Sequence, residues 1–315
     1  MQIKSFFKTM SDGAEVWTNR WMPDEDVKIK GIVELHHGLA EHSMRYDRLG
    51  TIFAENGYIF NAYDFRGHGR TAENAKSKNK GDFGILADKD GFNRCVEDLN
   101  EQIEGLKSEF PGVPVILLGH SFGSFVSQGY IEKYSDKITG CILCGTAGPR
   151  KLLVGSGKIV VDILKFFRGA KTVSPFVIKL AFGSYNNHIK NPKTSNDWLS
   201  KNQDNVHIYE MDQWCGFPLP IGFFADMMSG LKQIHKSSNI KKISNDLPIY
   251  FIYGSEDPVG DYGKTINKLY AIYQKNGVKN LEIKAYDTLR HELFNEEEKE
   301  TIEKDVLTWI EKTIR

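Results

Sequence analysis

The sequence predicts an α/β fold built on a mostly parallel central sheet with helices on both faces. Strand-like runs alternate with helix-like stretches along most of the 315 residues, and this alternation favours parallel strand connections. Several of the strand-like runs, such as "PVILLG" at 114–119 and "LPIYFIYG" at 247–254, are apolar throughout, as strands covered on both faces are. The length exceeds the usual size of one compact core, so we expect one large domain with an insertion, or two domains that share a surface.

The first half of the chain supplies the elements in a regular order. Residues 14–22 are typical of an early strand in a hairpin, and 30–38 form a buried strand that runs into a glycine turn. A helix is expected over 45–57. The elements expected next are a strand at 58–64, a helix with apolar residues at helical spacing at 91–110, the strand at 114–119, a helix at 121–135 and a strand at 137–145.

The alternation fails between about Arg150 and His235. This segment is rich in apolar residues interrupted by lysines, glycine and proline, and it contains the polar loop "NNHIKNPKTSNDW". We predict a helical insertion at 150–235 that lies over one end of the sheet, within a main domain formed by 1–149 and 236–315. Its apolar excess packs it onto the main domain, and could also line an apolar pocket or contact a membrane.

The end of the chain returns to the alternation. The elements expected there are a strand at 247–254, a helix at 265–277, a strand at 281–287 and a final helix at 297–314. They complete a sheet in which most neighbouring strands are parallel.

The stretch Gly119-His120-Ser121-Phe122-Gly123 has the G-x-S-x-G pattern between an apolar strand and a helix. In this pattern a sharp turn forces the serine into a strained conformation, and the flanking glycines avoid collisions with the neighbouring strand and helix. The turn exposes the hydroxyl at a helix N-terminus, where free N–H groups favour negative charge. The pattern predicts a nucleophilic Ser121, which needs a histidine and a carboxylate as partners.

The expected partners follow the last two strands, in the order serine, acid, histidine. Glu256 and Asp257 lie in a turn directly after 247–254, and His291 lies in a loop after 281–287. We prefer Asp257 as the acid, because the following proline fixes the turn, and keep Glu256 as the alternative. For the histidines of the insertion, surface or core roles are expected; these are His188, His207 and His235.

The developing oxyanion needs two backbone donors. The first is the N–H of Phe122, directly after the nucleophile, and the second is the N–H of Leu39, in the loop after the strand at 30–38. The three histidines near this loop do not predict a metal site. His36 and His37 are adjacent at a strand end and diverge, and no carboxylate–histidine spacing supports a closed site with His42.

Five motifs together resemble the monoacylglycerol lipase and lysophospholipase family of the α/β-hydrolase fold, particularly its bacterial members: "HHGLAEHSMRY", "YDFRGHGRT", "GHSFGS", "SEDPVG" and "RHELFNE". They span nearly the whole chain except the insertion. The resemblance implies the same catalytic residues, namely Ser121, Asp257 and His291, with the Leu39 and Phe122 amides as the oxyanion hole. It also implies that the insertion is a cap that shapes an acyl pocket.

Two positions depart from the family pattern. Ala40 and Ser124 stand where such lipases usually or often have glycine. Neither change removes a catalytic group, but both leave the substrate open.

Two other motifs favour structural roles. "DFRGHGR" at 64–70 lacks the spacing of a dinucleotide-binding loop, so we expect a connection that supports the active-site loops, without direct catalysis by His68. Cys141 and Cys144 form a C-x-x-C within a buried strand, with no second pair to complete a zinc site. We expect both to be small core side chains.

The predicted function is therefore a cofactor-independent serine hydrolase of carboxylic esters with an apolar acyl chain, acting through an acyl-enzyme. A peptidase or amidase of the same fold is the alternative, which needs an acidic group in the cap to hold a peptide amine. The available acids are Asp197, Glu210, Asp212 and Asp226. A non-catalytic ligand-binding protein is a further alternative, disfavoured by the intact catalytic set.

Charge and hydropathy limit the partners. Lysine and arginine total 41 and so do the acids, and no basic stripe indicates nucleic-acid binding. No apolar run resembles a membrane span or a signal peptide, so we expect a cytoplasmic protein with a small-molecule or lipid ester substrate. Any membrane contact would be peripheral, through the apolar cap surface. The oligomeric state is not predicted.

Overall fold

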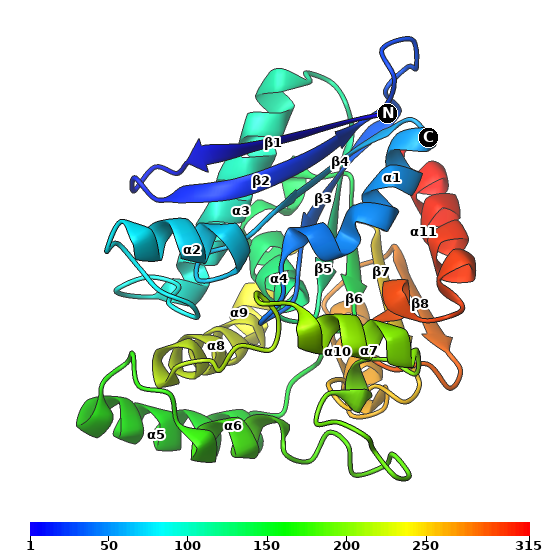
Figure 1. The fold of residues 1–315 in the computed structure, drawn as a ribbon. Helices are drawn as coiled ribbons and strands as arrows, with labels where there is room; N and C mark the ends of the chain where they lie inside the picture. Colours follow the sequence, from blue (N-terminus) through cyan, green and yellow to red (C-terminus); the bar gives the residue numbers. More distant parts are fainter.

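The computed structural model describes residues 1–315 and contains one eight-stranded sheet with helices on both faces (Figure 1). The strand order is β1-β2-β4-β3-β5-β6-β7-β8. β1 pairs antiparallel with β2, and β2 with β4, whereas the other neighbours are parallel. The strands are β1 (Gln2–Thr9), β2 (Glu15–Met22), β3 (Gly31–His36), β4 (Tyr58–Tyr63), β5 (Val115–His120), β6 (Gly140–Cys144), β7 (Ile249–Gly254) and β8 (Leu281–Tyr286). The predicted α/β fold with a mostly parallel sheet is confirmed.

Helices cover each face of the sheet and bury a separate apolar core. The larger core lies on the face covered by α3 (Gly91–Glu109), α4 (Phe122–Tyr134), α8 (Ile221–Ile234) and α10 (Lys264–Lys275). The smaller core lies under α1 (Asp47–Glu55) and α11 (Lys299–Thr313). The 3₁₀ turns are η1 (Ser43–Tyr46), η2 (Ser135–Lys137), η3 (Asp197–Leu199) and η4 (Leu293–Asn295). No helix combines the length and the apolar character needed to cross a bilayer.

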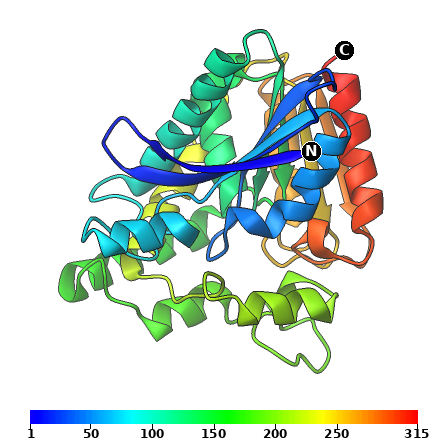
Figure 2. The same ribbon diagram turned by 45° about the horizontal axis from the view of Figure 1, so that its top comes forward.

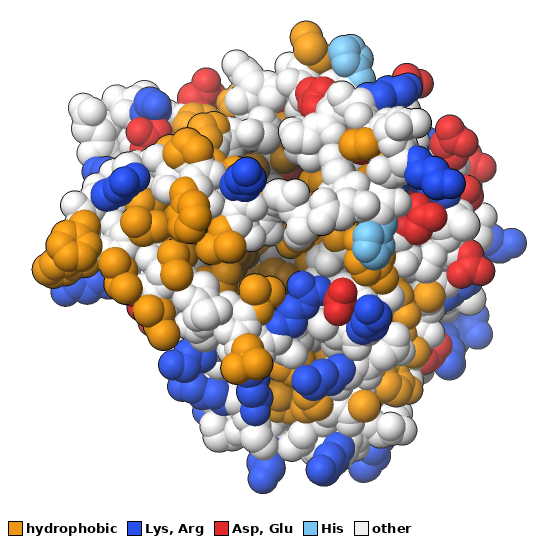
Figure 3. Space-filling model, turned by 90° about the horizontal axis from the view of Figure 1, so that it is seen from below, with side chains coloured by type: hydrophobic (Ala, Val, Ile, Leu, Met, Phe, Trp, Pro, Cys, Tyr) orange, Lys and Arg blue, Asp and Glu red, His pale blue; other side chains and the backbone are white.

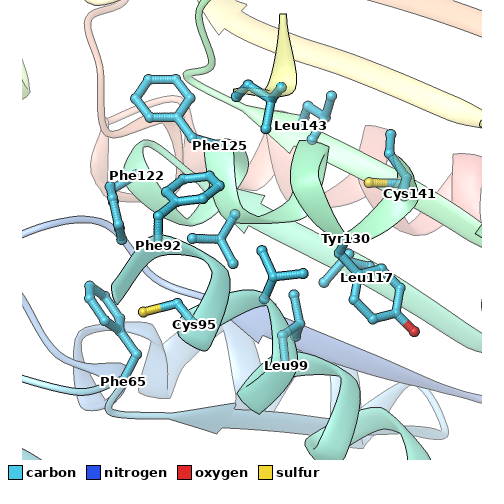
Figure 4. Close-up of a cluster of buried hydrophobic side chains, with 14 of the residues drawn as sticks. Phe65, Phe92, Cys95, Leu99, Leu117, Phe122, Phe125, Tyr130, Cys141 and Leu143 are labelled. Atoms are coloured by element: carbon cyan, nitrogen blue, oxygen red, sulfur yellow. The ribbon is translucent and has the colours of Figure 1, made fainter. Parts of the chain in front are cut away.

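Figure 4 shows part of the larger core, in which aromatic side chains of α3 and α4 pack against the sheet. Cys141 belongs to this core, whereas Cys144 belongs to the core on the opposite face. Both are free and fully buried. The prediction that they are small core side chains is therefore confirmed. They lie in different cores because residues three apart on a strand face opposite sides.

Two helices were not expected from the sequence. The segment α2 (Gly69–Ser77) begins inside the glycine-rich stretch, and α9 (Ser237–Ile240) is a single turn. In α2 only Gly69, Thr71 and Ala72 are buried. A helix with so little apolar surface has no apolar periodicity by which to recognise it.

The segment that interrupts the alternation is helical, with α5 (Lys151–Arg168), α6 (Pro175–Phe182) and α7 (Gln203–Met211) preceding α8. Figures 1 and 2 show α5, α6 and α7 beyond the carboxyl ends of the parallel strands. By contrast, α8 packs against α3 and α4 and contributes to the larger core. The division of the chain at 150 and 235 stays a prediction.

Candidate active site

Ser121 occupies the turn between β5 and α4, at the carboxyl edge of the sheet. Its backbone has φ 53° and ψ −120°, a strained combination for a residue with a side chain. A Cβ at Gly123 would overlap the carbonyl oxygen of His36, and one at Gly119 would overlap the Ser127 side chain. The strand and helix therefore approach so closely that only glycine fits on either side of the serine.

The acid and the histidine meet beside this turn. Nδ1 of His291 lies 2.9 Å from Oδ2 of Asp257, and both side chains are almost fully buried. The other carboxylate oxygen of Asp257 accepts the Val259 N–H at 2.8 Å. Nε2 of His291 is buried and has no hydrogen-bond partner, so it is free to receive a proton.

The alternative acid lies elsewhere. Glu256 is about half exposed, with its carboxylate 3.8 Å from Nε of Arg290 and 3.9 Å from Nζ of Lys201. The structure therefore brings Asp257, and not Glu256, to the histidine.

The loop after β3 lies against the serine. A Cβ at Gly38 would lie 3.2 Å from Cβ of Ser121, and Leu39 lines the same cavity as Ser121. Phe122 is the first residue of α4, and the first N–H groups of a helix have no partner within it. These positions suit the expected oxyanion hole. The roles of the five site residues stay predictions, for Ser121, Asp257, His291, Leu39 and Phe122.

Both departures from the family pattern have visible consequences. Ala40 has φ 49°, a left-handed conformation that glycine adopts more easily. Its carbonyl oxygen accepts the Gly216 N–H at 2.9 Å and the Tyr209 hydroxyl at 3.0 Å, which ties the loop to the helical insertion. The Ser124 hydroxyl is buried and donates to the Ser121 carbonyl at 2.5 Å.

A buried ionic cluster lies beside His291, and it was not predicted from the sequence. Arg45 forms two parallel hydrogen bonds to Glu292, at 2.5 and 2.7 Å, and a third to Glu41 at 2.7 Å. Burial opposes the ionisation of Glu292, but the charge of Arg45 and its hydrogen bonds keep the pKa of that carboxyl below its usual value. The cluster joins the loop after β3 to the loop that carries His291. The family motifs contain Arg45, Glu41 and Glu292, but the spacing of these residues in the sequence does not indicate that they are in contact.

His120, next to the nucleophile, belongs to the same cluster. Its Nδ1 lies 2.8 Å from the Tyr46 hydroxyl and 3.3 Å from Glu41, and its Nε2 lies 3.3 Å from the His291 carbonyl oxygen. Burial would lower the pKa of His120, but the hydrogen bond to Glu41 and the charge of that carboxylate raise it. Its ring lies 4.8 Å from the His291 ring.

The remaining histidines of the motifs do not converge on one point. Burial lowers the pKa of His36, His37 and His68 to about 3, so they are neutral side chains of the interior. His68 packs on Phe65, with ring centroids 3.8 Å apart. Asp64, from the same motif, accepts hydrogen bonds from the backbone and hydroxyl of Ser43 at 2.8 and 2.6 Å. The stretch 64–70 thus supports the loop after β3.

His42 contacts the helical insertion instead. Its Nε2 lies 2.8 Å from Oδ2 of Asp212, and Trp214 packs on its ring with centroids 5.3 Å apart. Cys215 completes a group of possible ligand atoms within 4.8 Å of one another. Burial raises the pKa of the Cys215 thiol, which keeps it protonated.

A cavity of about 350 Å³ leads from Ser121 into the helical insertion. Its walls include Phe125 of α4 and residues of α5, α6 and α8. Trp198, in the polar loop of the insertion, lines the cavity with its ring 5.0 Å from that of His291. The burial of Trp198 was not expected from the sequence, because most of its neighbours in the chain are polar.

The fold and this turn define an α/β hydrolase with a serine at the sharp strand–helix turn. A family model described as serine aminopeptidase, S33 matches residues 27–298, so the chain belongs to this family. A monoacylglycerol lipase from Mycolicibacterium smegmatis is 27% identical over 307 residues, covering 95% of this chain and 93% of the relative. A monoglyceride lipase from Homo sapiens is 23% identical, covering 80% and 72%.

The fold also matches a solved structure. The crystal structure of a thermostable carboxyl esterase from Bacillus coagulans, in complex with glycerol, superposes with a TM-score of 0.89. The two chains are 28% identical and are covered completely. The predicted resemblance to the monoacylglycerol lipase and lysophospholipase family of the α/β-hydrolase fold is confirmed.

Proposed function

We propose that this protein hydrolyses carboxylic esters of apolar acyl chains, of the monoacylglycerol or lysophospholipid type, through an acyl-enzyme on Ser121. The observation that carries the proposal is the cavity at the serine, since 18 of its 25 lining residues are hydrophobic. Such a lining holds an alkyl chain by burying it from water. The relatives described as monoacylglycerol lipases support an ester substrate.

In the proposed reaction, Oγ of Ser121 attacks the ester carbonyl carbon while Nε2 of His291 accepts the hydroxyl proton. The N–H groups of Leu39 and Phe122 stabilise the negative oxygen of the tetrahedral intermediate. Its collapse breaks the ester C–O bond, and His291 returns the proton to the departing alcohol. Asp257 holds the required tautomer through Nδ1. A water molecule repeats the sequence, which releases the fatty acid and restores the serine.

The peptidase alternative is not favoured by the cavity. None of the four acids available in the insertion is among the cavity-lining residues. Asp212 is paired with His42, and Asp197 accepts hydrogen bonds from Lys193 and Thr194. Glu210 accepts a hydrogen bond from Asn196, and Asp226 lies beside Gly91 on α3. The lipase and esterase relatives do not favour the non-catalytic alternative either.

The test compares rates on 1-oleoylglycerol, lysophosphatidylcholine, p-nitrophenyl butyrate and aminoacyl p-nitroanilides. Ser121→Ala should lose on the order of a million-fold in kcat, as in related serine chemistry. Ser124→Ala is the matched control, because it removes a nearby buried hydroxyl and leaves the attacking atom in place. Cleavage of anilides alone, or undiminished ester turnover by Ser121→Ala, would contradict the proposal.

The proposal also includes peripheral membrane contact and a cytoplasmic location. Nine large apolar side chains on α5, α6 and their connection are exposed, and they support contact with a lipid phase: Leu152, Leu153, Ile159, Ile163, Phe166, Phe167, Val173, Phe176 and Leu180. The four cysteines are free, buried thiols, which suits a reducing compartment.

A further inference from the structure

The outer surface of α5 and α6 combines apolar and cationic side chains, and Figure 3 shows them together around a hollow. We call the surface formed by residues 151–180 the docking face. From its charge pattern we propose that it selects bilayers that contain anionic lipids. This inference rests on the lipid contact proposed above and adds the chemistry of the headgroup.

The apolar part of the docking face is a stripe along one side of α5. Leu152, Ile159, Ile163 and Phe166 follow the spacing i, i+7, i+11, i+14 and point outward, with exposed fractions of 90%, 62%, 52% and 83%. Phe167, next to this stripe, is 78% exposed. The opposite side of the helix buries Val154 and Val161. An apolar side that stays exposed after the helix has packed on the rest of the protein indicates a binding site for a further apolar partner.

The cationic part flanks this stripe. Lys151, Lys158 and Lys165 recur every seven residues along one side of α5. Across residues 151–180 six cations face one acid, Asp162, whose carboxylate is 2.5 Å from Nζ of Lys158. The other cations of the face are Arg168, Lys171 and Lys179. Residues 151–180 thus carry a formal charge of +5, six cations minus one acid, whereas the whole chain is neutral.

The position of the cavity favours a membrane as the occupant. Leu153 and Leu180 both line the cavity and are 55% and 53% exposed, so the cavity opens on the docking face. An acyl chain could pass from the bilayer to Ser121 without crossing water. A second copy of the chain is a poorer occupant, because it would bring two surfaces of the same charge together.

The charges and apolar side chains should act separately. The attraction of each Lys or Arg to an anionic surface is screened by salt, whereas apolar insertion depends little on the headgroup. The cations therefore set the preference for anionic lipid, and the phenylalanines set the binding that remains on neutral lipid.

The experiment measures flotation of the Ser121→Ala protein with vesicles of phosphatidylcholine, with and without about a third of phosphatidylglycerol. We expect at least about tenfold tighter binding to the anionic vesicles, lost at high salt. The triple variant Lys151→Gln, Lys165→Gln, Lys171→Gln should lose this preference and keep the residual binding. Phe166→Ser with Phe167→Ser should weaken binding to both kinds of vesicle.

The matched control removes three exposed cations outside the docking face, by Lys268→Gln, Lys275→Gln and Lys304→Gln, and should keep the preference. Equal binding to both vesicles, no binding at all, or the same loss in the control would overturn the proposal. So would a dimer in sedimentation that the phenylalanine variant abolishes. Hydrolysis of soluble p-nitrophenyl butyrate by the unmodified protein tests the proposed enzyme independently of vesicle binding.

Discussion

Gly38 and Ser121, from loops after two adjacent strands, are in such close contact that a Cβ at position 38 would lie 3.2 Å from Cβ of the serine. The same Cβ would lie 3.3 Å from Nδ1 of His120. The expected oxyanion donors therefore depend on a residue without a side chain.

Gly38→Ala should lower kcat while the protein remains folded. The added methyl group would lie 2.7 Å from Oε1 of Glu41 and 3.2 Å from Cβ of Ser121, so the loop that carries Leu39 must shift, and loss of one oxyanion donor costs about 100- to 1000-fold. The measurement is kcat on 1-oleoylglycerol together with the melting temperature. Gly155→Ala is the control, because a Cβ there meets nothing within 4 Å; unchanged kcat in Gly38→Ala would contradict the close approach.

Arg45→Met should destabilise the fold by about 3–5 kcal/mol, since it leaves the buried Glu41 and Glu292 without their cation. The free energy of unfolding in urea at neutral pH measures the effect. Lys279→Met is the control: this lysine is 67% exposed and pairs with Asp246, which is 78% exposed, so its loss should cost no more than about 1 kcal/mol. Equal losses of unfolding free energy in the two variants would contradict a larger contribution of the buried cluster to stability.

Ala40→Gly should stabilise the protein by about 0.5–1 kcal/mol. The left-handed conformation costs alanine about 1–2 kcal/mol, which the change to glycine removes. The greater freedom of glycine in the unfolded chain offsets about 0.5–1 kcal/mol of this stabilisation. Ala271→Gly, within α10, should instead destabilise by about 1 kcal/mol. Urea denaturation of both variants checks the opposite signs, and a loss at position 40 would count against the strain.

Glu34→Gln should change how stability depends on pH. Glu34 is fully buried in β3 with one hydrogen bond, from Asn61 at 2.8 Å, and burial raises its pKa from 4.5 to about 8. A raised pKa means that the folded protein keeps a proton that the unfolded chain has released. Glu34 therefore lowers stability as the pH rises from about 4.5 to about 8, by several kcal/mol at most.

The glutamine variant should remove this loss. Relative to the unmodified protein, Glu34→Gln should be similar at pH 5 and more stable by on the order of 3 kcal/mol at pH 9. Unfolding free energies at the two pH values provide the comparison, and Glu25→Gln, in an exposed loop, should show no such difference. A constant difference across this range would contradict the raised pKa.

The sequence predicts the sheet and the Ser121 turn well because both leave local signals. A strand buried on both faces is apolar throughout, and the turn requires glycines at fixed positions. Asp257 and His291 could be located because the parallel strands bring their loops to the same edge.

The ionic cluster has no such signal. Arg45 and Glu292 are 247 residues apart, and only the packing of two loops brings them together. The helix α2 was not predicted because it is nearly all polar, and its contacts with neighbouring segments stabilise it. Trp198 stands in a polar loop, where composition predicts exposure rather than contact with His291.

The position of α8 bears on which part of the chain could be exchanged to change the acyl site. In the chain this helix lies between β6 and β7, and it packs on α3 and α4, while Phe224, Met227, Met228 and Leu231 of α8 form one wall of the cavity. Residues 150–220 are the loop that leads from β6 to α8 and contains α5, α6 and α7, and within it Val173 forms an isolated bridge with Pro220. An exchange of this loop between relatives would replace one wall of the acyl site and the surface that meets lipid, and would keep the other wall and the chemistry. The unit of exchange for engineering substrate preference thus ends at Pro220, before α8.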